Sequence, residues 1–120
     1  MNKKPPHDIY ERTKEFSLRV IRLFSALPKT TVAQVIGKQM LRSATSVGAH
    51  LREGRRSRSN AELISKIGGA LQELDETGYW LELLDESGVV EIDSLKSLNT
   101  ELNELIAILV ASVKKLKARK

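Results

Sequence analysis

Apolar residues recur along almost the whole chain at alternating spacings of three and four residues. That spacing places them on one side of an α-helix, whereas a half-buried β-strand requires alternation at every second residue. Proline is absent after Pro28, and the clearest interruptions beyond it are at Gly54 and Gly88. The pattern therefore predicts four helices, over residues 8–27, 31–53, 60–87 and 94–117.

The connection between the second and third predicted helices carries the clearest end signals. Gly54 suits the left-handed position that follows many helix C-termini. Ser59 and Glu62 form a capping box, in which the hydroxyl and the carboxylate each accept a hydrogen bond from a free backbone N–H. On the second helix, the apolar stripe starts at Val32 and passes through Met40. These signals fix the expected helix–loop–helix unit around Glu53, Gly54, Ser59 and Glu62.

A chain of 120 residues can build one domain with a real core but is too short for two ordinary ones. We therefore expect a single all-α domain over residues 1–120, an antiparallel up-down-up-down four-helix bundle. The sequence has no apolar run of membrane-spanning length and no recognisable signal peptide. The expected location is accordingly cytoplasmic, with no membrane partner.

Residue types that carry catalysis are scarce. The chain has no cysteine and two histidines, which excludes thiol catalysis and leaves too few ligands for a zinc site. We expect neither enzymatic activity nor a cofactor or metal. Gly68 and Gly69 favour a close helix contact, because the lysine of a phosphate-binding loop is missing. His50 is expected to pack or to donate a hydrogen bond, and Glu53 is expected to form a structural ion pair.

Charge is distributed unevenly along the chain. The net charge is +5, but residues 28–58 carry seven basic and one acidic side chain, whereas residues 59–90 carry one and seven. In an up-down bundle, the N-terminus, the second connection and the C-terminus meet at one end. The basic residues expected at that end are Lys3, Lys4, Arg52, Arg55, Arg56, Arg58, Lys114, Lys115, Lys117, Arg119 and Lys120.

Such a cluster has two interpretations. Arginine and lysine side chains in this density bind the phosphates of nucleic acid, and arginine can do so bidentately. Alternatively, a solvated loop and a basic tail near helix C-termini improve solubility and complement the helix dipoles. The residues alone do not choose between these interpretations.

Apolar and charged side chains left outside the core favour self-association. Trp80 is expected on the outer face of the third helix, and Ile108 lies in a run that is apolar almost all round. Basic Lys38, Arg42 and Arg52 on the second helix complement acidic Glu62, Glu73 and Glu76 on the third. Two different complementary patches favour head-to-tail contacts that close into a ring. The alternative is that these charges pair within one chain.

Residues 39–63 also carry a specific resemblance. The run from Gln39 to Val47, followed by Glu53-Gly54, Arg58-Ser59 and Glu62-Leu63, is similar to the four-helix-bundle proteins encoded in intervening sequences of bacterial 23S ribosomal RNA genes. Ala70, Leu74 and Glu76 suit the third helix of that family. The resemblance implies an antiparallel bundle that assembles as a pentameric ring, without an established enzymatic activity.

The resemblance further implies a relationship to the accessory proteins of diversity-generating retroelements, which bind nucleic acid and a reverse transcriptase. It also implies that Arg42 contacts the backbone of the bound strand. Four residues depart from the family pattern and make the connection more basic. They are His50, Arg52, Arg55 and Arg56. Our leading hypothesis is a homo-oligomer that binds RNA or DNA through phosphate contacts. The alternative is an adaptor that holds a protein partner on its outer apolar and acidic faces.

Overall fold

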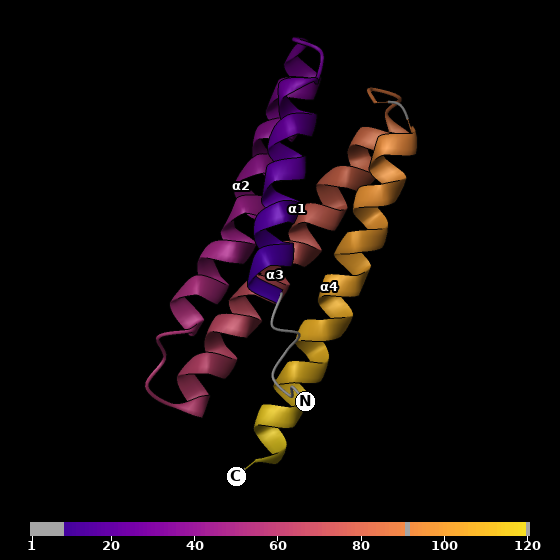
Figure 1. Ribbon diagram of the computed structural model, residues 1–120. Coiled ribbons are helices and arrows are strands. Elements are labelled where there is room, and N and C mark those ends of the chain that lie inside the picture. The colour runs from indigo at the N-terminus through magenta and orange to yellow at the C-terminus, as the bar shows by residue number, and fades with distance from the viewer. Residues whose placement is uncertain (1–8, 91, 120) are drawn as a thin grey trace.

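The computed structural model describes residues 9–90 and 92–119. They form four helices, α1 (Ile9–Ser25), α2 (Thr31–Gly54), α3 (Asn60–Glu86) and α4 (Ile92–Ala118), and these described residues contain no strand. The helices pack into one elongated bundle of 50 × 23 × 19 Å (Figure 1). The expected four-helix, all-α architecture is confirmed.

The helix ends follow from local chemistry. Ala26 and Leu27 donate to carbonyl oxygens three residues back, so α1 tightens and ends at Ser25, two residues earlier than expected before Pro28. The N-terminus of α2 is capped by the Thr30 hydroxyl, which accepts a hydrogen bond from the Ala33 N–H at 3.2 Å. After α3, Gly88 adopts a φ of 75°, which glycine tolerates and other residues resist.

One core runs along the inside of all four helices. Its largest fully buried side chains include Phe16, Met40, Leu74 and Leu105, one from each helix. Val32 was expected in this stripe but is 52% exposed, and Ala33 and Gly37 occupy the buried positions of the first turns of α2 instead. The reason is close approach: a Cβ on Gly37 would lie 2.5 Å from Leu27 Cδ1, so the core side of this turn admits only small residues.

Each helix packs against two others, in the order α1, α2, α3, α4 and back to α1. Within the described chain the α2–α3 pair has the most extensive contact, and a buried hydrogen bond crosses it between the hydroxyls of Ser43 and Thr77 at 2.7 Å. The α1–α4 pair is held instead by a surface cluster, in which Arg12 binds Glu101 twice and Glu104 once at 2.7–3.0 Å. These partners raise the pKa of the Arg12 guanidinium, chiefly through the hydrogen bonds to Glu101.

No helix among the described residues is long and apolar enough to span a lipid bilayer. Those residues also contain no group of three or more histidine and carboxylate side chains placed to hold a metal ion.

Candidate nucleic-acid interface

Two basic segments lie at the same end of the molecule. The connection between α2 and α3 and the last turns of α4 meet at the lower end in Figure 1. The basic side chains on these two segments are all exposed. They are Arg55, Arg56, Arg58, Lys114, Lys115, Lys117 and Arg119. Lys3, Lys4 and Lys120, which were expected at this end, lie outside the described residues.

These exposed charges are not neutralised inside the described part of the chain. The ion pairs found there use Arg12, Arg22, Arg42, His50 and Lys66 as the basic partners, and none uses a residue of the two basic segments. Arg52, one turn before the connection, is likewise exposed and without a carboxylate partner among these pairs. We call Arg52, the connection and the α4 tail together the basic end.

The connection itself has a defined backbone. The N–H groups of Arg55, Arg56 and Ser57 donate to carbonyl oxygens of the last turn of α2 at 3.0–3.1 Å, so the chain leaves the helix through tight successive turns. Gly54 was expected just beyond the helix in a left-handed conformation. It is instead the buried last residue of α2, and the residue after it, Arg55, has φ −61°.

Close packing explains the glycine at position 54. A Cβ there would lie 3.2 Å from Leu63 Cδ1 and 3.3 Å from Lys66 Cβ, both on α3. The absent side chain therefore lets the end of α2 approach the start of α3. This approach fixes the direction in which the arginines of the connection leave the bundle.

The expected capping box is present at the start of α3. The Ser59 hydroxyl accepts a hydrogen bond from the Glu62 N–H at 3.1 Å. The Glu62 carboxylate accepts one from the backbone N–H of Arg58 at 3.0 Å, one residue before the cap itself. Ser59 and Glu62 thus brace the backbone of Arg58 and leave its side chain exposed.

Glu53 forms the structural ion pair expected of it, but its partner is Lys66 on α3 and not an arginine of the connection. Lys66 Nζ donates to Glu53 Oε1 at 2.9 Å. This hydrogen bond is the main reason that the pKa of the Glu53 carboxyl lies below its ordinary value. The pair ties α2 to α3 at the basic end.

Arg42, expected to contact phosphates, is engaged within the chain. Its guanidinium binds Glu73 at 3.3 Å and Glu76 at 2.6 Å, and the charge of Glu73 is the main cause that raises the pKa of Arg42. His50 Nε2 lies 3.9 Å from the other oxygen of Glu73. Arg42, Glu73 and Glu76, offered above for contacts between copies, therefore favour the alternative of pairing within one chain.

Glycine at position 69 makes room for His50. A Cβ at this position would lie 3.1 Å from the Cε1 and Nδ1 atoms of the imidazole, whereas nothing lies within 4 Å of a Cβ at Gly68. The expected close helix contact is thus present at Gly69 and absent at Gly68. His50 packs between α2 and α3 as a structural residue.

Aromatic residues are placed differently from the sequence expectation. Trp80 is half-buried against the core, and its indole Nε1 is shielded from solvent without a hydrogen-bond partner among the described residues. The exposed aromatic is its neighbour Tyr79, whose ring centroid lies 5.2 Å from that of Trp80. Ile108 is also half-buried. The large exposed apolar residues of the described chain are Leu18, Ile21, Val32, Val35, Tyr79 and Val110.

Tyr10 is a residue of the basic end that sequence analysis missed. The guanidinium carbon of Arg55 lies 4.4 Å from the centroid of its ring, a cation–π contact between the start of α1 and the end of α2. The available signal was the position of Tyr10 three residues before Thr13, which places it on the α2 side of α1. The expected up-down order puts the start of α1 at the same end as the connection, but the linear sequence does not indicate which residue of the connection meets the Tyr10 ring.

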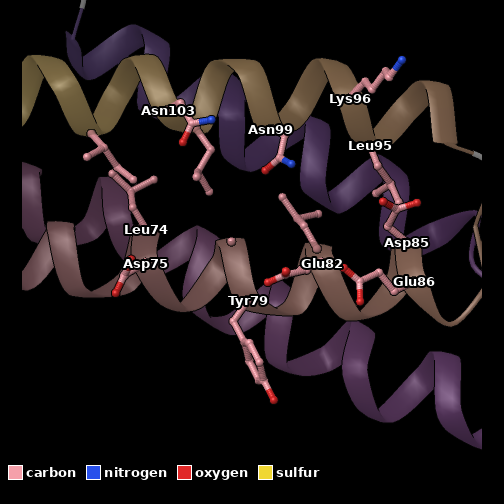
Figure 2. A pocket seen from close by; sticks show the side chains of 14 residues that line it. Leu74, Asp75, Tyr79, Glu82, Asp85, Glu86, Leu95, Lys96, Asn99 and Asn103 are labelled. Carbon is pink, nitrogen blue, oxygen red and sulfur yellow. The ribbon is translucent and has the colours of Figure 1, made fainter.

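A second surface feature is acidic and lies on another side of the bundle. A groove of about 690 Å³ runs between α3 and α4. Figure 2 shows Glu82, Asp85 and Glu86 projecting from α3 and Asn99 and Asn103 from α4. Its apolar lining is contributed by Leu74, Leu81, Leu95, Leu102 and Ile106. We call this feature the acidic groove.

The fold and the basic end define the class of protein: a small all-α four-helix protein with a basic surface that forms no ion pair with a carboxylate of residues 9–90 or 92–119. Residues 6–111 match the family model of the 23S rRNA-intervening sequence protein, and the chain belongs to this family. The resemblance based on residues 39–63 is thereby confirmed.

A solved structure supports the same assignment. The chain is 33% identical to a protein with unknown function from the S23 ribosomal protein family of Bacteroides thetaiotaomicron. The TM-score is 0.86, and the alignment covers 92% of this chain and 99% of that one. A comparison with curated proteins found no match.

Proposed function

We propose that the protein is a non-enzymatic, cytoplasmic, homo-oligomeric bundle that binds RNA or DNA through its basic end. The observation that carries the proposal is the contrast between two groups of cations. Arg12 and Arg42 on the sides of the bundle are paired with carboxylates, whereas the arginines and lysines of the basic end have none among the described residues. Unpaired, exposed cations are the groups that release counterions when they bind phosphates.

The backbone of the connection supports this assignment. Arg55, Arg56 and Arg58 project from tight turns that the Ser59–Glu62 capping box and the buried Gly54 hold in place. Cations on a fixed backbone lose less conformational entropy on binding than cations on a free tail. The binding expected from such a surface follows the shape and charge of the strand, because no base-reading motif is present.

We further propose an antiparallel bundle assembled as a head-to-tail ring, with five copies as the family resemblance implies. Thr13 faces Gly48 while Phe24 faces Gly37, and Ser43 contacts Thr77 while Glu53 contacts Lys66. Along each pair, residue numbers rise on one helix as they fall on the other, which supports the antiparallel course of these helices.

The two surfaces that meet in the proposed ring contact lie at the same level along the long axis of the bundle. Val35 lies eight residues before Ser43, and Asp85 lies eight residues after Thr77, so the two are level. Exposed Val32, Val35 and Lys38 on α2 are apolar and basic, whereas the acidic groove is apolar and acidic. Complementary surfaces at one height on two different sides suit a ring whose axis runs along the bundle.

Replacing the three arginines of the connection by neutral residues tests the binding proposal. We expect the triple variant Arg55→Gln, Arg56→Gln, Arg58→Gln to bind labelled RNA and DNA more weakly. On duplex DNA its salt dependence should be flatter by about 0.9 for each phosphate contact removed. The matched control neutralises Arg22, Lys29 and Lys96 at the opposite end, which changes the net charge equally. Equal loss in both triple variants would show that only overall charge matters and would remove the connection from the interface.

The acidic groove favours a second candidate, an adaptor for a protein partner such as the reverse transcriptase implied by the family resemblance. Its apolar floor and carboxylate rim fit a basic amphipathic helix. On this account, purified protein carries no nucleic acid and its ultraviolet absorbance shows a low 260/280 ratio. Nucleic acid that copurifies and is released by salt favours the binding proposal instead.

A further inference from the structure

A groove between α1 and α2 opens beside the basic end. Its volume is about 390 Å³, and its lining includes the small residues Ser17, Gly48 and Ala49. Because these side chains are short, the surface between the two helices is hollowed there. The volume falls within the range of sites that hold a small molecule or a nucleotide.

The charged lining of this groove is mostly basic. Lys14 and Arg52 are exposed and take part in none of the ion pairs of the described chain, while Arg55 is held over Tyr10. Glu11 is the one carboxylate that the described residues contribute to the lining. Since Thr13 lies opposite Gly48 and Tyr10 opposite Arg55, the side chain of Arg52 lies between these two levels, close to the Tyr10–Arg55 pair.

The Tyr10–Arg55 pair is itself a stacking platform. Tyr10 is half-buried, so its ring is fixed by the core, and Arg55 is exposed although it contacts that ring. The guanidinium carbon lies over the ring at 4.4 Å from its centroid while the residue stays exposed, and nucleobases stack on arginine and aromatic side chains. Bulk solubility would require neither the aromatic ring nor the groove.

We propose that the α1–α2 groove binds one unstacked nucleotide of a bound strand, with the base on the Tyr10–Arg55 pair and the adjoining phosphates on Arg52 and Lys14. This inference rests on the proposed nucleic-acid function and makes it specific. Bases in a duplex are stacked on their neighbours and unavailable to such a site. The protein therefore prefers single-stranded RNA or DNA, or an unpaired loop, over duplex.

The test compares three fluorescein-labelled probes of equal length: oligouridylate, oligodeoxythymidylate and duplex DNA. Single-stranded pyrimidine runs leave their base faces free, and the two single strands distinguish RNA from DNA. We expect Tyr10→Leu to weaken binding to the single strands at least about fivefold, in line with the loss of one stacked base. Duplex binding should be unchanged, and Tyr10→Phe should retain the wild-type affinity for all three probes.

A second pair of variants separates stacking from charge. Arg55→Lys keeps the charge but loses the flat guanidinium, so it should weaken binding to the single strands by a larger factor than binding to the duplex. The matched control Arg22→Lys, on an exposed arginine at the opposite end of the bundle, should change neither. Ala49→Leu fills the groove from an exposed position and should act like Tyr10→Leu without affecting the fold, which circular dichroism checks.

The outcomes separate this inference from the proposed function. Strong, salt-sensitive binding that Tyr10→Leu, Arg55→Lys and Ala49→Leu leave unchanged would overturn the stacking site and preserve the basic end as a phosphate-binding surface. A wild-type preference for duplex would likewise overturn it. Absence of binding to all three probes at low salt would overturn the proposed function and this inference with it.

Discussion

Gly68 and Gly69 are adjacent in the sequence but meet different surroundings. Gly68 faces open space, whereas Gly69 faces the imidazole of His50 across the α2–α3 contact. Glycine inside a helix costs about 0.5–1 kcal/mol relative to alanine because of its extra backbone freedom. The two positions therefore make a matched test of whether a close helix contact or backbone entropy decides the effect of a methyl group.

We predict that Gly68→Ala stabilises the protein by up to about 1 kcal/mol. Gly69→Ala should stabilise the protein less than Gly68→Ala does, or should destabilise it, because the new Cβ meets the imidazole of His50 at 3.1 Å. Urea unfolding of both variants measures the difference. The double variant Gly69→Ala, His50→Ala removes the obstructing ring, so substituting Gly69 should be more favourable in a His50→Ala background. An equal gain in unfolding free energy from Gly68→Ala and Gly69→Ala would contradict the packing described between α2 and α3.

Individual side chains show where sequence analysis reaches its limit. A structural ion pair for Glu53 was predictable, because it stands beside several cations in the sequence. Its partner was not, because Lys66 approaches only when the missing side chain of Gly54 brings α3 close. Trp80 was expected outside on the helical wheel, yet it is half-buried against the core, one turn after Glu76 and Thr77, which contact α2. The wheel treats the bundle interior as one direction, whereas a helix with two neighbours buries a wider arc.

At the scale of the elements, α2 and α3 are joined at the basic end by the Glu53–Lys66 pair. Lys66 donates to the carboxylate and lowers its pKa below the ordinary value of 4.5. A carboxyl whose pKa is lowered by folding stabilises the native state fully above its unfolded pKa. That contribution is lost as the pH falls from about 4.5 through the lower native pKa.

We therefore predict that the Glu53 carboxyl titrates below pH 4.5 in the folded protein, as measured by carbon NMR of the side chain. Lys66→Met should move its midpoint back toward 4.5. The difference in unfolding free energy between wild type and Lys66→Met should be constant near neutral pH and shrink in acid. A midpoint that does not respond to Lys66→Met would contradict the pair.

The helices themselves were the most predictable part of the molecule. Their number and type followed from apolar spacing, and the ends of the described helices lie within two residues of expectation. The capping box at Ser59 and Glu62 was visible because all of its groups are local in sequence. The prediction of a left-handed conformation at Gly54 was wrong. A glycine near a helix end allows either a left-handed turn or the close approach of another helix, and the position of the neighbouring helix decides between them.

For the whole molecule, the sequence predicted that basic residues cluster at one end, but it did not predict the grooves in the molecular surface. The expected up-down order of the helices predicts that Arg52, the α2–α3 connection and the α4 tail place their cations at one end of the bundle. Neither groove was predictable, because each arises from how two helices meet and from which side chains are short. The acidic groove and the α1–α2 groove lie on different helix pairs, so one molecule can offer a basic and an acidic surface at once.

Self-association is a prediction about the whole molecule. Val35 and Val110 are both exposed valines, but only Val35 belongs to the proposed ring contact. We predict that Val35→Asp lowers the mass measured by light scattering to that of a monomer, because it places a carboxylate against the acidic groove of the next copy. Val110→Asp should keep the wild-type mass. The reverse result would transfer the contact to α4, and a monomeric wild type would exclude the ring.

The central claim is that the unpaired cations of the basic end bind nucleic acid, and its most direct test is binding by the wild-type protein at two salt concentrations. Purified protein is titrated into labelled structured RNA, single-stranded DNA and duplex DNA at about 50 and 200 mM salt. We predict binding at the lower concentration that falls by about 10³-fold or more at the higher one, as expected when six or more phosphates are contacted. Absence of binding at low salt, or an affinity that salt does not change, would contradict the account.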